Sequence, residues 1–496
     1  WSTYPERLQA AGISWKVYQD VGTGLTADGY WGWTANPYIG NYGDNSLLYF
    51  HQYQNAQPGS PLYEGALTGT NVLGDPTQTF FDILKADVAK GTLPQVSWIV
   101  APEAFSEHPN WAPNFGAWYT SQVLQILTSN EELWSQTALF ITYDENDGFF
   151  DHVVPPTPAQ TPAQGQSTVS VANDFFAGNA NYPAGPYGLG QRVPMIVVSP
   201  WTRGGWVCSE VFDHTSLIRF IEQRFGAGNG GLRESNITPW RRAVCGDLVS
   251  AFNFASPNDV VPALPSTTGY LPADSLRHPS YVPTPPAVQA MPSQESGLKW
   301  SRALPYRLAA HGRIDSTHRT YQIDFVNQGD AGAVFRVSVA GSADAPRTYT
   351  VEPGKRLHDG WTTVPSNGRY GFVVTGPGAF HREFAGDAVA AATGSRIAPE
   401  ARVEHGGLGD DSVRLLLTNE GATPVTLTVA ANAYSRSPAR RYRLAPGASV
   451  EDRWSVADSH GWYDLSVTCD ASAAFLRRMA GRVENGRPRV SDPATA

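Results

Sequence analysis

The sequence predicts an α/β domain followed by two tandem β-sandwich-like domains, and three observations support this prediction. Apolar segments of strand type and helix type alternate in residues 1–254, which is typical of a mostly parallel sheet covered by helices on both faces. A stretch at 255–293 is rich in proline, as expected of an extended linker. The rest of the chain is an internal repeat, with one copy at 294–392 and the other at 395–485.

Five segments define the predicted α/β domain. Strands are predicted at Val96–Val100, Ala138–Tyr143 and Val193–Val198, and amphipathic helices at Ala117–Thr128 and Thr215–Phe225. In parallel sheets of this kind the active site forms beyond the carboxyl ends of the strands. The polar residues that follow the first two strands are therefore the candidates for function.

The repeat is carried by short matching motifs. Asn327-Gln-Gly matches Asn419-Glu-Gly at an offset of 92 residues (419 − 327), and Phe380 matches Phe475 at an offset of 95 (475 − 380). Small insertions therefore separate two copies of one fold. Alternating segments such as Tyr321-Gln-Ile-Asp-Phe predict strands, and two β-sandwich-like domains of roughly 90–100 residues follow from them.

Composition and charge exclude several classes of protein. With 41% hydrophobic and 16% charged residues, the 496-residue chain is an ordered globular protein. Residues 1–290 carry 12 basic and 24 acidic residues (−12), whereas residues 291–496 carry 24 and 21 (+3). An acidic first part argues against nucleic-acid binding and fits cation binding. Apolar runs such as Ala138–Tyr143 fall far short of the ~20 residues of a membrane span. The sequence leaves open whether Cys208 and Cys245 form a disulfide or are free thiols, and it does not determine the state of Cys469.

The segment Asp144-Glu145-Asn-Asp-Gly148 is the strongest functional signal. Neighbouring side chains on a strand point to opposite faces, so both acids reach one ion if the strand ends there and the backbone turns, which the Asn-Asp-Gly sequence permits. Carboxylates favour Ca²⁺, Mg²⁺ or Mn²⁺, and mixed Asp/His sites also suit Zn²⁺ or Fe. The alternative is a solvated acidic turn. An EF-hand loop is excluded, because Pro155 stands where its last ligand should be.

Two histidines follow carboxylates in the same part of the chain. His108 comes after Glu107 and His152 after Asp151, and each can bind a metal, bind phosphate or protonate a leaving group, or else be a surface histidine. In Asp213-His214, the helix N-cap role of Asp213 is sufficient explanation. No G-x-S-x-G elbow, P-loop or G-x-G-x-x-G motif occurs, which leaves metal-assisted hydrolysis as the coherent chemistry.

Several longer motifs occur along the first part of the chain. They are Trp15-Lys-Val-Tyr-Gln-Asp20, Leu93-Pro-Gln-Val-Ser-Trp-Ile-Val100, Phe105-Ser-Glu-His-Pro109, Thr142-Tyr-Asp-Glu-Asn-Asp-Gly-Phe-Phe-Asp-His152, Gly190-Gln-Arg-Val-Pro-Met195, Ser199-Pro-Trp-Thr-Arg-Gly-Gly-Trp206 and Phe212-Asp-His-Thr-Ser216. Together these motifs resemble one known family, the bacterial phosphocholine-preferring phospholipases C, which include haemolytic and non-haemolytic enzymes and are related to acid phosphatases. The tandem repeats resemble that family too, and the likeness covers nearly the whole chain.

The resemblance implies an alkaline-phosphatase-like α/β fold, incomplete at its N-terminus, and hydrolysis of phosphatidylcholine-type lipids to diacylglycerol and phosphocholine at a membrane or micelle surface. It implies that Asp144 and Glu145 hold a divalent metal ion, that His108 lies at the phosphate site and that His152 assists. A Glu-Asn-Arg metal motif, a hydroxyl nucleophile and a secretion signal are expected upstream of Trp1, which implies a secreted or periplasmic enzyme. Aromatic residues such as Tyr30-Trp-Gly-Trp33 are candidates for binding choline.

Two other interpretations remain open at the level of sequence. One is an acid phosphomonoesterase of the same fold, against which the C-terminal repeats argue. The other is a catalytically inert fragment in which residues 291–496 bind lipid or a partner. The metal, the head-group preference and the oligomeric state are not determined by the sequence.

Overall fold

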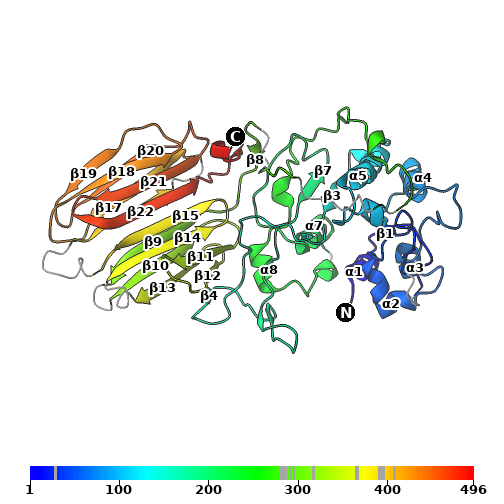
Figure 1. Cartoon of the computed structure of the whole chain (residues 1–496), viewed down its shortest axis with the longest axis horizontal. Coiled ribbons are helices and arrows are strands. Elements are labelled where there is room, and N and C mark those ends of the chain that lie inside the picture. Colours follow the sequence, from blue (N-terminus) through cyan, green and yellow to red (C-terminus); the bar gives the residue numbers. More distant parts are fainter. Residues whose placement is uncertain are drawn as a thin grey trace.

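The computed structural model of the chain has an α/β part and a β-rich part, which lie at opposite ends of the molecule (Figure 1). It describes residues 1–26, 31–228, 230–276, 278, 287–290, 293, 296–315, 319–362, 368–388, 397–405 and 409–495. None of the helices in these ranges is long and apolar enough to cross a membrane.

The α/β part alternates short strands with helices, as the sequence predicts. Its elements are α1 (Tyr4–Ala10), β1 (Trp15–Tyr18), α2 (His51–Gln54), α3 (Pro61–Ala66), α4 (Asp82–Lys90), β2 (Val96–Ile99), α5 (Pro113–Thr128), α6 (Glu131–Trp134), β3 (Leu139–Thr142), β4 (Gly165–Ser167), β5 (Phe175–Phe176), β6 (Gly185–Pro186), β7 (Met195–Val198), α7 (Thr215–Phe225) and α8 (Pro239–Val244).

The predicted mostly parallel sheet is wrong for the described residues. β1 and β2 pair in parallel, because α2, α3 and α4 between them supply the crossover that parallel strands need. β3 and β7 pair antiparallel instead, with Leu139 opposite Val198. The chain between them, residues 143–194, forms three short strands and no helix, so nothing carries it back to start a parallel strand.

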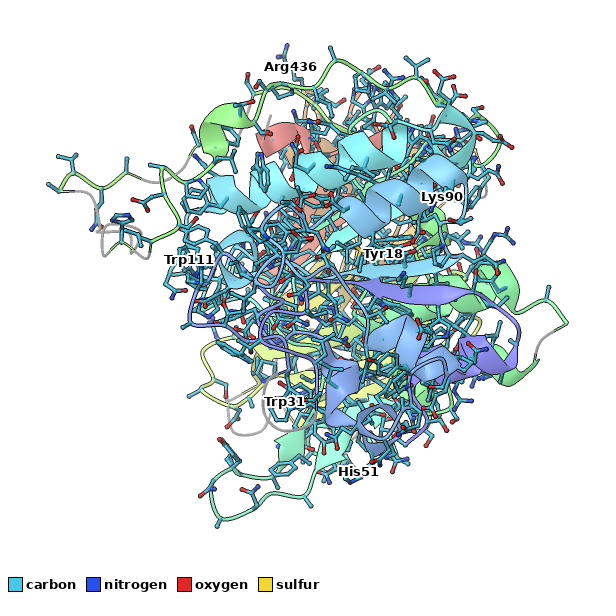
Figure 2. The ribbon with its side chains drawn as sticks, turned by 90° about the vertical axis from the view of Figure 1, so that its right-hand side faces the viewer. Tyr18, Trp31, His51, Lys90, Trp111 and Arg436 are labelled. Atoms are coloured by element: carbon cyan, nitrogen blue, oxygen red, sulfur yellow. The ribbon has the colours of Figure 1, made fainter. Side chains whose placement is uncertain are left out.

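An aromatic core lies beneath α5. Phe81, Phe105 and Tyr119 pack on one another, with ring centroids 4.8 Å apart for Phe81 and Tyr119 and 6.0 Å apart for Phe105 and Tyr119. Tyr18 of β1 and Trp111 belong to the same cluster and are labelled in Figure 2, where this part of the molecule faces the viewer. The burial of this aromatic cluster fixes the path of the chain after β2, and so the place of the segment around residue 108.

The proline-rich segment leads from the α/β part to the repeats. Residues 255–276 are almost entirely exposed and contain one 3₁₀ turn, Thr268–Tyr270. The hydroxyl of Tyr38 donates to the carbonyl of Leu276 at 3.0 Å, so the segment runs over the surface of the first part. The predicted linker and domain boundaries at 255–293 stay predictions, since much of 277–295 lies outside the described residues.

Strands make up nearly all of the β-rich part, and they form two copies of one arrangement. Each copy has a three-stranded sheet (β13-β10-β9 or β16-β17-β20) and contributes four strands to one nine-stranded sheet of order β19-β18-β21-β22-β15-β14-β11-β12-β4. The elements are β8 (Trp300–Ser301), β9 (Leu308–Asp315), β10 (Thr320–Asn327), β11 (Ala333–Val339), β12 (Arg347–Val351), β13 (Arg356–Thr362), β14 (Arg369–Gly376), β15 (Phe380–Asp387), β16 (Pro399–His405), β17 (Ser412–Asn419), β18 (Val425–Ala433), β19 (Arg440–Leu444), β20 (Ser449–Ser455), β21 (Trp462–Cys469), β22 (Ser472–Arg482) and β23 (Arg489–Val490).

The two copies are joined through β15 and β22, which pair antiparallel at the centre of the long sheet. Each of these strands places a buried arginine in the other copy. Arg382 donates to the carbonyl of Ala480 at 2.9 Å and to the hydroxyl of Tyr463 at 2.9 Å. Arg477 donates to the carbonyl of Ala385 at 2.8 Å and to the hydroxyl of Tyr370 at 3.0 Å.

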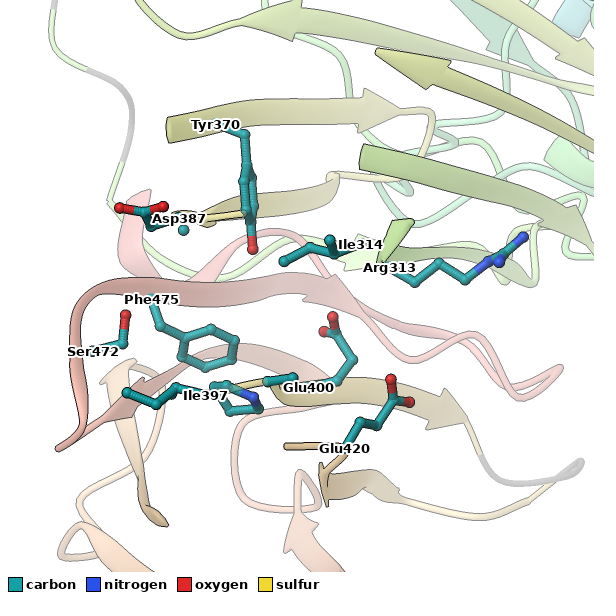
Figure 3. A pocket seen from close by; sticks show the side chains of 12 residues that line it. Arg313, Ile314, Tyr370, Asp387, Ile397, Glu400, Glu420, Ser472 and Phe475 are labelled. Atoms are coloured by element: carbon teal, nitrogen blue, oxygen red, sulfur yellow. The ribbon is translucent and has the colours of Figure 1, made fainter. Parts of the chain in front are cut away.

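A small cavity of about 30 Å³ opens at this seam, lined by Tyr370 of the first copy and by Phe475 and Glu400 of the second (Figure 3). A second cavity of about 20 Å³ lies at the matching place, where Tyr463 and Phe380 stand in the same roles. The seam is therefore close to two-fold symmetric. The three cysteines, Cys208, Cys245 and Cys469, are all free thiols in the structure.

Candidate functional site

The acid pair lies where the sequence predicts it, in a turn that follows β3. The strand ends at Thr142, and the backbone N–H of Phe149 donates to the carbonyl of Asn146 at 2.7 Å to close the turn. Asp147 has a φ of +49°, a left-handed conformation that aspartate tolerates better than most residues. Both Asp144 and Glu145 are exposed, so the pair is open to solvent and to a ligand.

His108 follows β2 and the 3₁₀ turn Glu103–Phe105. Its Nδ1 hydrogen-bonds to Oδ1 of Asn110, and its backbone N–H donates to the hydroxyl of Ser106 at 3.3 Å. The ring meets Tyr42 edge to face, with centroids 5.9 Å apart. Because Asn110 Oδ1 can only accept, Nδ1 carries the proton and Nε2 is the ring nitrogen left for a substrate.

The structure brings His108 close to the acid pair. The pKa of Glu145 is raised by a hydrogen bond with Asp147 and by the Asp144 carboxylate, and His108 opposes that rise. A direct tie also exists between the two segments: the hydroxyl of Tyr143 donates to Oε2 of Glu107 at 2.5 Å. Burial, together with the Glu107 carboxylate, raises the pKa of Tyr143 to about 12.

Asp44 belongs to the same site, and the sequence analysis missed it. Desolvation by the surrounding protein raises the pKa of Asp44 to about 6, Asp144 adds to the rise and His108 opposes it. The residue keeps exposed surface, so desolvation is partial, but the charge of Asp144 acts in the same direction. Asp44 follows no predicted strand and lies in a turn-like Asn-Tyr-Gly-Asp sequence, so no local signal could have singled it out.

His214 contacts the acid pair more directly than expected. Its Nε2 donates to the carbonyl oxygen of Asp144 at 3.0 Å. The predicted N-cap role of Asp213 is wrong, because the N-cap residue of α7 is His214. Asp213 still accepts from the backbone N–H of Thr215 at 2.9 Å, and it forms an ion pair with Arg241 at 2.6 Å. The start of α7 therefore packs against the turn that carries Asp144.

His152 is not brought to the other site residues. It is exposed at the far end of the turn, and the preceding Asp151 is engaged in an ion pair with Arg192. Within the described ranges, no hydrogen bond joins His152 to His108, Asp144 or Glu145. A catalytic role for His152 stays a prediction.

Aromatic rings border the site on the side of His108. Trp33 and Tyr42 lie 4.8 Å apart between ring centroids, and Trp31 and Tyr49 lie 4.6 Å apart. Trp33 is 44% exposed, so part of its surface remains available to a ligand. The predicted choline-binding segment 30–33 is described from residue 31 onward, and residue 30 lies outside the described residues.

The carboxylates fit a divalent cation as part of a ligand set. Asp144 raises the pKa of both Asp44 and Glu145, which shows negative charges crowded together at one place, and a bound cation would relieve that crowding. Among the described residues, no group of three His, Cys, Asp or Glu side chains is close enough to hold an ion. That Asp144 and Glu145 hold a divalent ion stays a prediction.

Two family models match successive parts of the chain. Residues 1–228 match the phosphoesterase family, and residues 300–387 and 392–482 match the C-terminal domain of bacterial phospholipase C. The chain is 59% identical over all of its length to the non-hemolytic phospholipase C of Burkholderia pseudomallei (strain K96243), of which it covers 70%. It is 46% identical over 99% of its length to the non-hemolytic enzyme of Pseudomonas aeruginosa (68% of that protein) and 40% identical over 99% to the hemolytic one (69%).

Proposed function

The chain belongs to the bacterial phospholipase C family, and on that premise we propose that it cleaves phosphatidylcholine-type lipids to diacylglycerol and phosphocholine. Membership makes it a phosphoric diester hydrolase that acts on phospholipids. The observation that carries the assignment of its site is electrostatic: Asp144 raises and His108 lowers the pKa values of Asp44 and Glu145, although these residues come from three separate segments.

In the proposed mechanism the acid pair and His108 act on the phosphodiester, and His214 holds the acid pair in place. A divalent ion held by Asp144 and Glu145 would neutralise the charge that develops on the phosphoryl oxygens. His108 presents Nε2 to the phosphoryl group, because Asn110 holds the other ring nitrogen. His214 holds the carbonyl of Asp144 and so limits movement of the turn. The expected hydroxyl nucleophile and the secreted or periplasmic location stay predictions, as does lipid or partner binding by the repeats.

We expect Asp144→Ala and Glu145→Ala each to lower phosphocholine release from phosphatidylcholine by more than tenfold, since a lost metal ligand costs several kcal/mol of charge stabilisation. The measurement is kcat/KM in the intact enzyme at saturating Mn²⁺. Asp259→Asn, an exposed acid in the linker, is the matched control and should keep the parent's activity. Variants that stay within tenfold of the parent would remove the metal role, and hydrolysis of p-nitrophenyl phosphate in preference to the lipid would indicate a phosphomonoesterase.

Choline recognition is assigned to the aromatic rings beside His108. A quaternary ammonium over an aromatic face is worth about 0.5–2 kcal/mol, or roughly 2- to 30-fold in selectivity. We expect Trp33→Leu to lower kcat/KM for phosphatidylcholine relative to phosphatidylglycerol by that factor. Trp300→Leu, an exposed tryptophan on β8, is the control. An unchanged ratio in Trp33→Leu would show that the head group binds elsewhere.

A further inference from the structure

The two segments that carry the site have no common backbone ladder. His108 follows β2, which pairs with β1, whereas Asp144 follows β3, which pairs with β7. Across the described residues these are two separate two-stranded sheets. Hydrogen bonds between strands therefore do not set the distance between His108 and Asp144, although catalysis needs that distance to be constant.

A side-chain hydrogen bond joins the two segments at the required place. The hydroxyl of Tyr143 donates to Oε2 of Glu107 at 2.5 Å, within a partly buried contact. Each partner is the residue immediately before a site residue, since Glu107 precedes His108 and Tyr143 precedes Asp144. A hydrogen bond to an ionised acceptor is among the stronger and shorter kinds.

Glu107 is itself held in one position by α5. Its φ is +65°, in the left-handed region that costs energy for a residue with a side chain. Its side chain lies over Gly116, where an added Cβ would come 2.2 Å from Glu107 Cγ and 2.5 Å from Oε1. Glycine at position 116 therefore makes room for the carboxyl group, and the first turns of α5 fix where it stands.

We propose that Glu107 and Tyr143 are positioning residues that hold His108 at a set distance from Asp144 and Glu145. The inference rests on the proposed function, because it assumes that His108 and the acid pair act on one substrate. In this proposal Glu107 and Tyr143 act through His108 and Asp144 and not on the reacting atoms themselves. Their hydrogen bond does the work that a continuous sheet would otherwise do, by coupling the loop after β2 to the turn after β3.

The test is a set of variants in the intact enzyme. Tyr143→Phe keeps the ring and removes the O–H, Glu107→Ala removes the acceptor, and Glu107→Gln keeps an acceptor oxygen. A displacement of about 1 Å costs on the order of 100-fold in rate, so Tyr143→Phe and Glu107→Ala are each expected to lower kcat on phosphatidylcholine by roughly 10- to 100-fold. KM and the affinity for Mn²⁺, measured by calorimetry, should stay within about threefold.

Two further results are expected if the hydrogen bond is the cause. Glu107→Gln should keep kcat within about threefold of the parent, and the double variant Tyr143→Phe/Glu107→Ala should be no slower than the slower single variant. Tyr182→Phe, an exposed tyrosine, is the matched control. If Tyr143→Phe fails to fold, as judged by circular dichroism and Tm, the comparison of Glu107→Ala with Glu107→Gln carries the test.

Other outcomes would overturn the proposal. If the losses in kcat multiply in the double variant, the two residues act independently. If Glu107→Gln is as slow as Glu107→Ala, the charge of Glu107 matters and the hydrogen bond does not. A fall in Tm with kcat unchanged would mean a purely structural bond, and a parallel loss of Mn²⁺ affinity would mean that it serves the acid pair alone. Asp144→Ala distinguishes a failure of the proposed function from a failure of the positioning role. If Asp144→Ala stays active, the proposed site is wrong. If it is inactive while Tyr143→Phe and Glu107→Ala match the parent, only the positioning role of the hydrogen bond is wrong.

Discussion

The repeated Asn-x-Gly motif is explained by the hydrogen bonds of its asparagine side chain and not by the strands around it. Asn327 donates through Nδ2 to the carbonyls of Ala331 and Val351 at 2.8 and 2.9 Å, and its Oδ1 accepts from the N–H of Gly329. Asn419 makes the same three bonds one copy later, at 2.9, 3.1 and 3.0 Å. The Asn-x-Gly pattern was therefore readable in the sequence because each buried asparagine must satisfy its own amide.

At the site, residues differ in how much the sequence could say about them. Asp144 and Glu145 follow a strand and precede a turn, so their pattern is local and predictable. Asp44 and His214 reach the same place from segments 100 residues before (144 − 44) and 70 residues after (214 − 144) the acid pair. Their roles depend on charge and contact across the fold, which no local pattern records.

A partly buried histidine in the first repeat predicts a pH dependence of stability. Burial, helped by the nearby cations Arg402 and Arg382 and opposed by Asp324, lowers the pKa of His311 to about 4. Because the folded pKa lies below the unfolded value of about 6.5, stability is complete above pH 6.5 and is lost as the pH falls towards 4.

The expected loss is on the order of 3 kcal/mol in the free energy of unfolding between pH 7 and pH 4. Urea unfolding at several pH values measures it. His311→Gln should flatten this part of the pH profile, whereas His51→Gln, at an exposed position, should leave it unchanged. A profile as steep in His311→Gln as in the parent would assign the loss to other groups.

At the scale of elements, the spacing of apolar residues predicted well which segments form helices and which form strands. The helix predicted at Thr215–Phe225 has those bounds in the structure, and the predicted strands at 96–100, 138–143 and 193–198 correspond to β2, β3 and β7. Pairing was predicted less well, because an apolar strand does not specify its neighbour. The antiparallel contact of β3 with β7 follows from the helix-free chain between them.

Contacts between elements also join the α/β part to the β-rich part. β4 of the α/β part adds to the long sheet in parallel beside β12, with Gly165 opposite Thr348. Trp240 of α8 is fully buried and donates through Nε1 to the hydroxyl of Thr350 at 2.9 Å. The two parts of the molecule are thus joined by a shared sheet edge and a buried hydrogen bond, neither of which has a sequence signature.

For the whole molecule, the seam between the repeats is the feature with the largest consequence. Arg477 is 1% exposed and forms a bidentate pair with Glu400, at 2.7 and 3.0 Å. Arg382 occupies the equivalent place in the other copy, bonded to carbonyls and a hydroxyl. The copies therefore share one sheet, and each donates hydrogen bonds from a buried arginine to the other, so we expect them to unfold together.

Glu400→Gln tests this seam, because it leaves the buried Arg477 without its counter-charge. Such a loss costs about 3–5 kcal/mol, seen as a lower free energy of unfolding of the intact protein in urea. Glu404→Gln lies on the same strand at an exposed position and should change that free energy by less than about 0.5 kcal/mol. Equal effects of the two substitutions would show that the ion pair contributes nothing specific to the seam.

The sequence by itself determined the order of the parts, the internal repeat, the acid pair after a strand and His108 after another. These depend on local spacing, on turn residues and on motifs a few residues long. The tertiary structure alone decided that β3 pairs antiparallel, that the repeats share a sheet, and that Asp44, His214 and the Glu107–Tyr143 hydrogen bond meet at one site. Those outcomes depend on the burial, charge and hydrogen bonds of residues far apart in the chain, which only the folded molecule brings together.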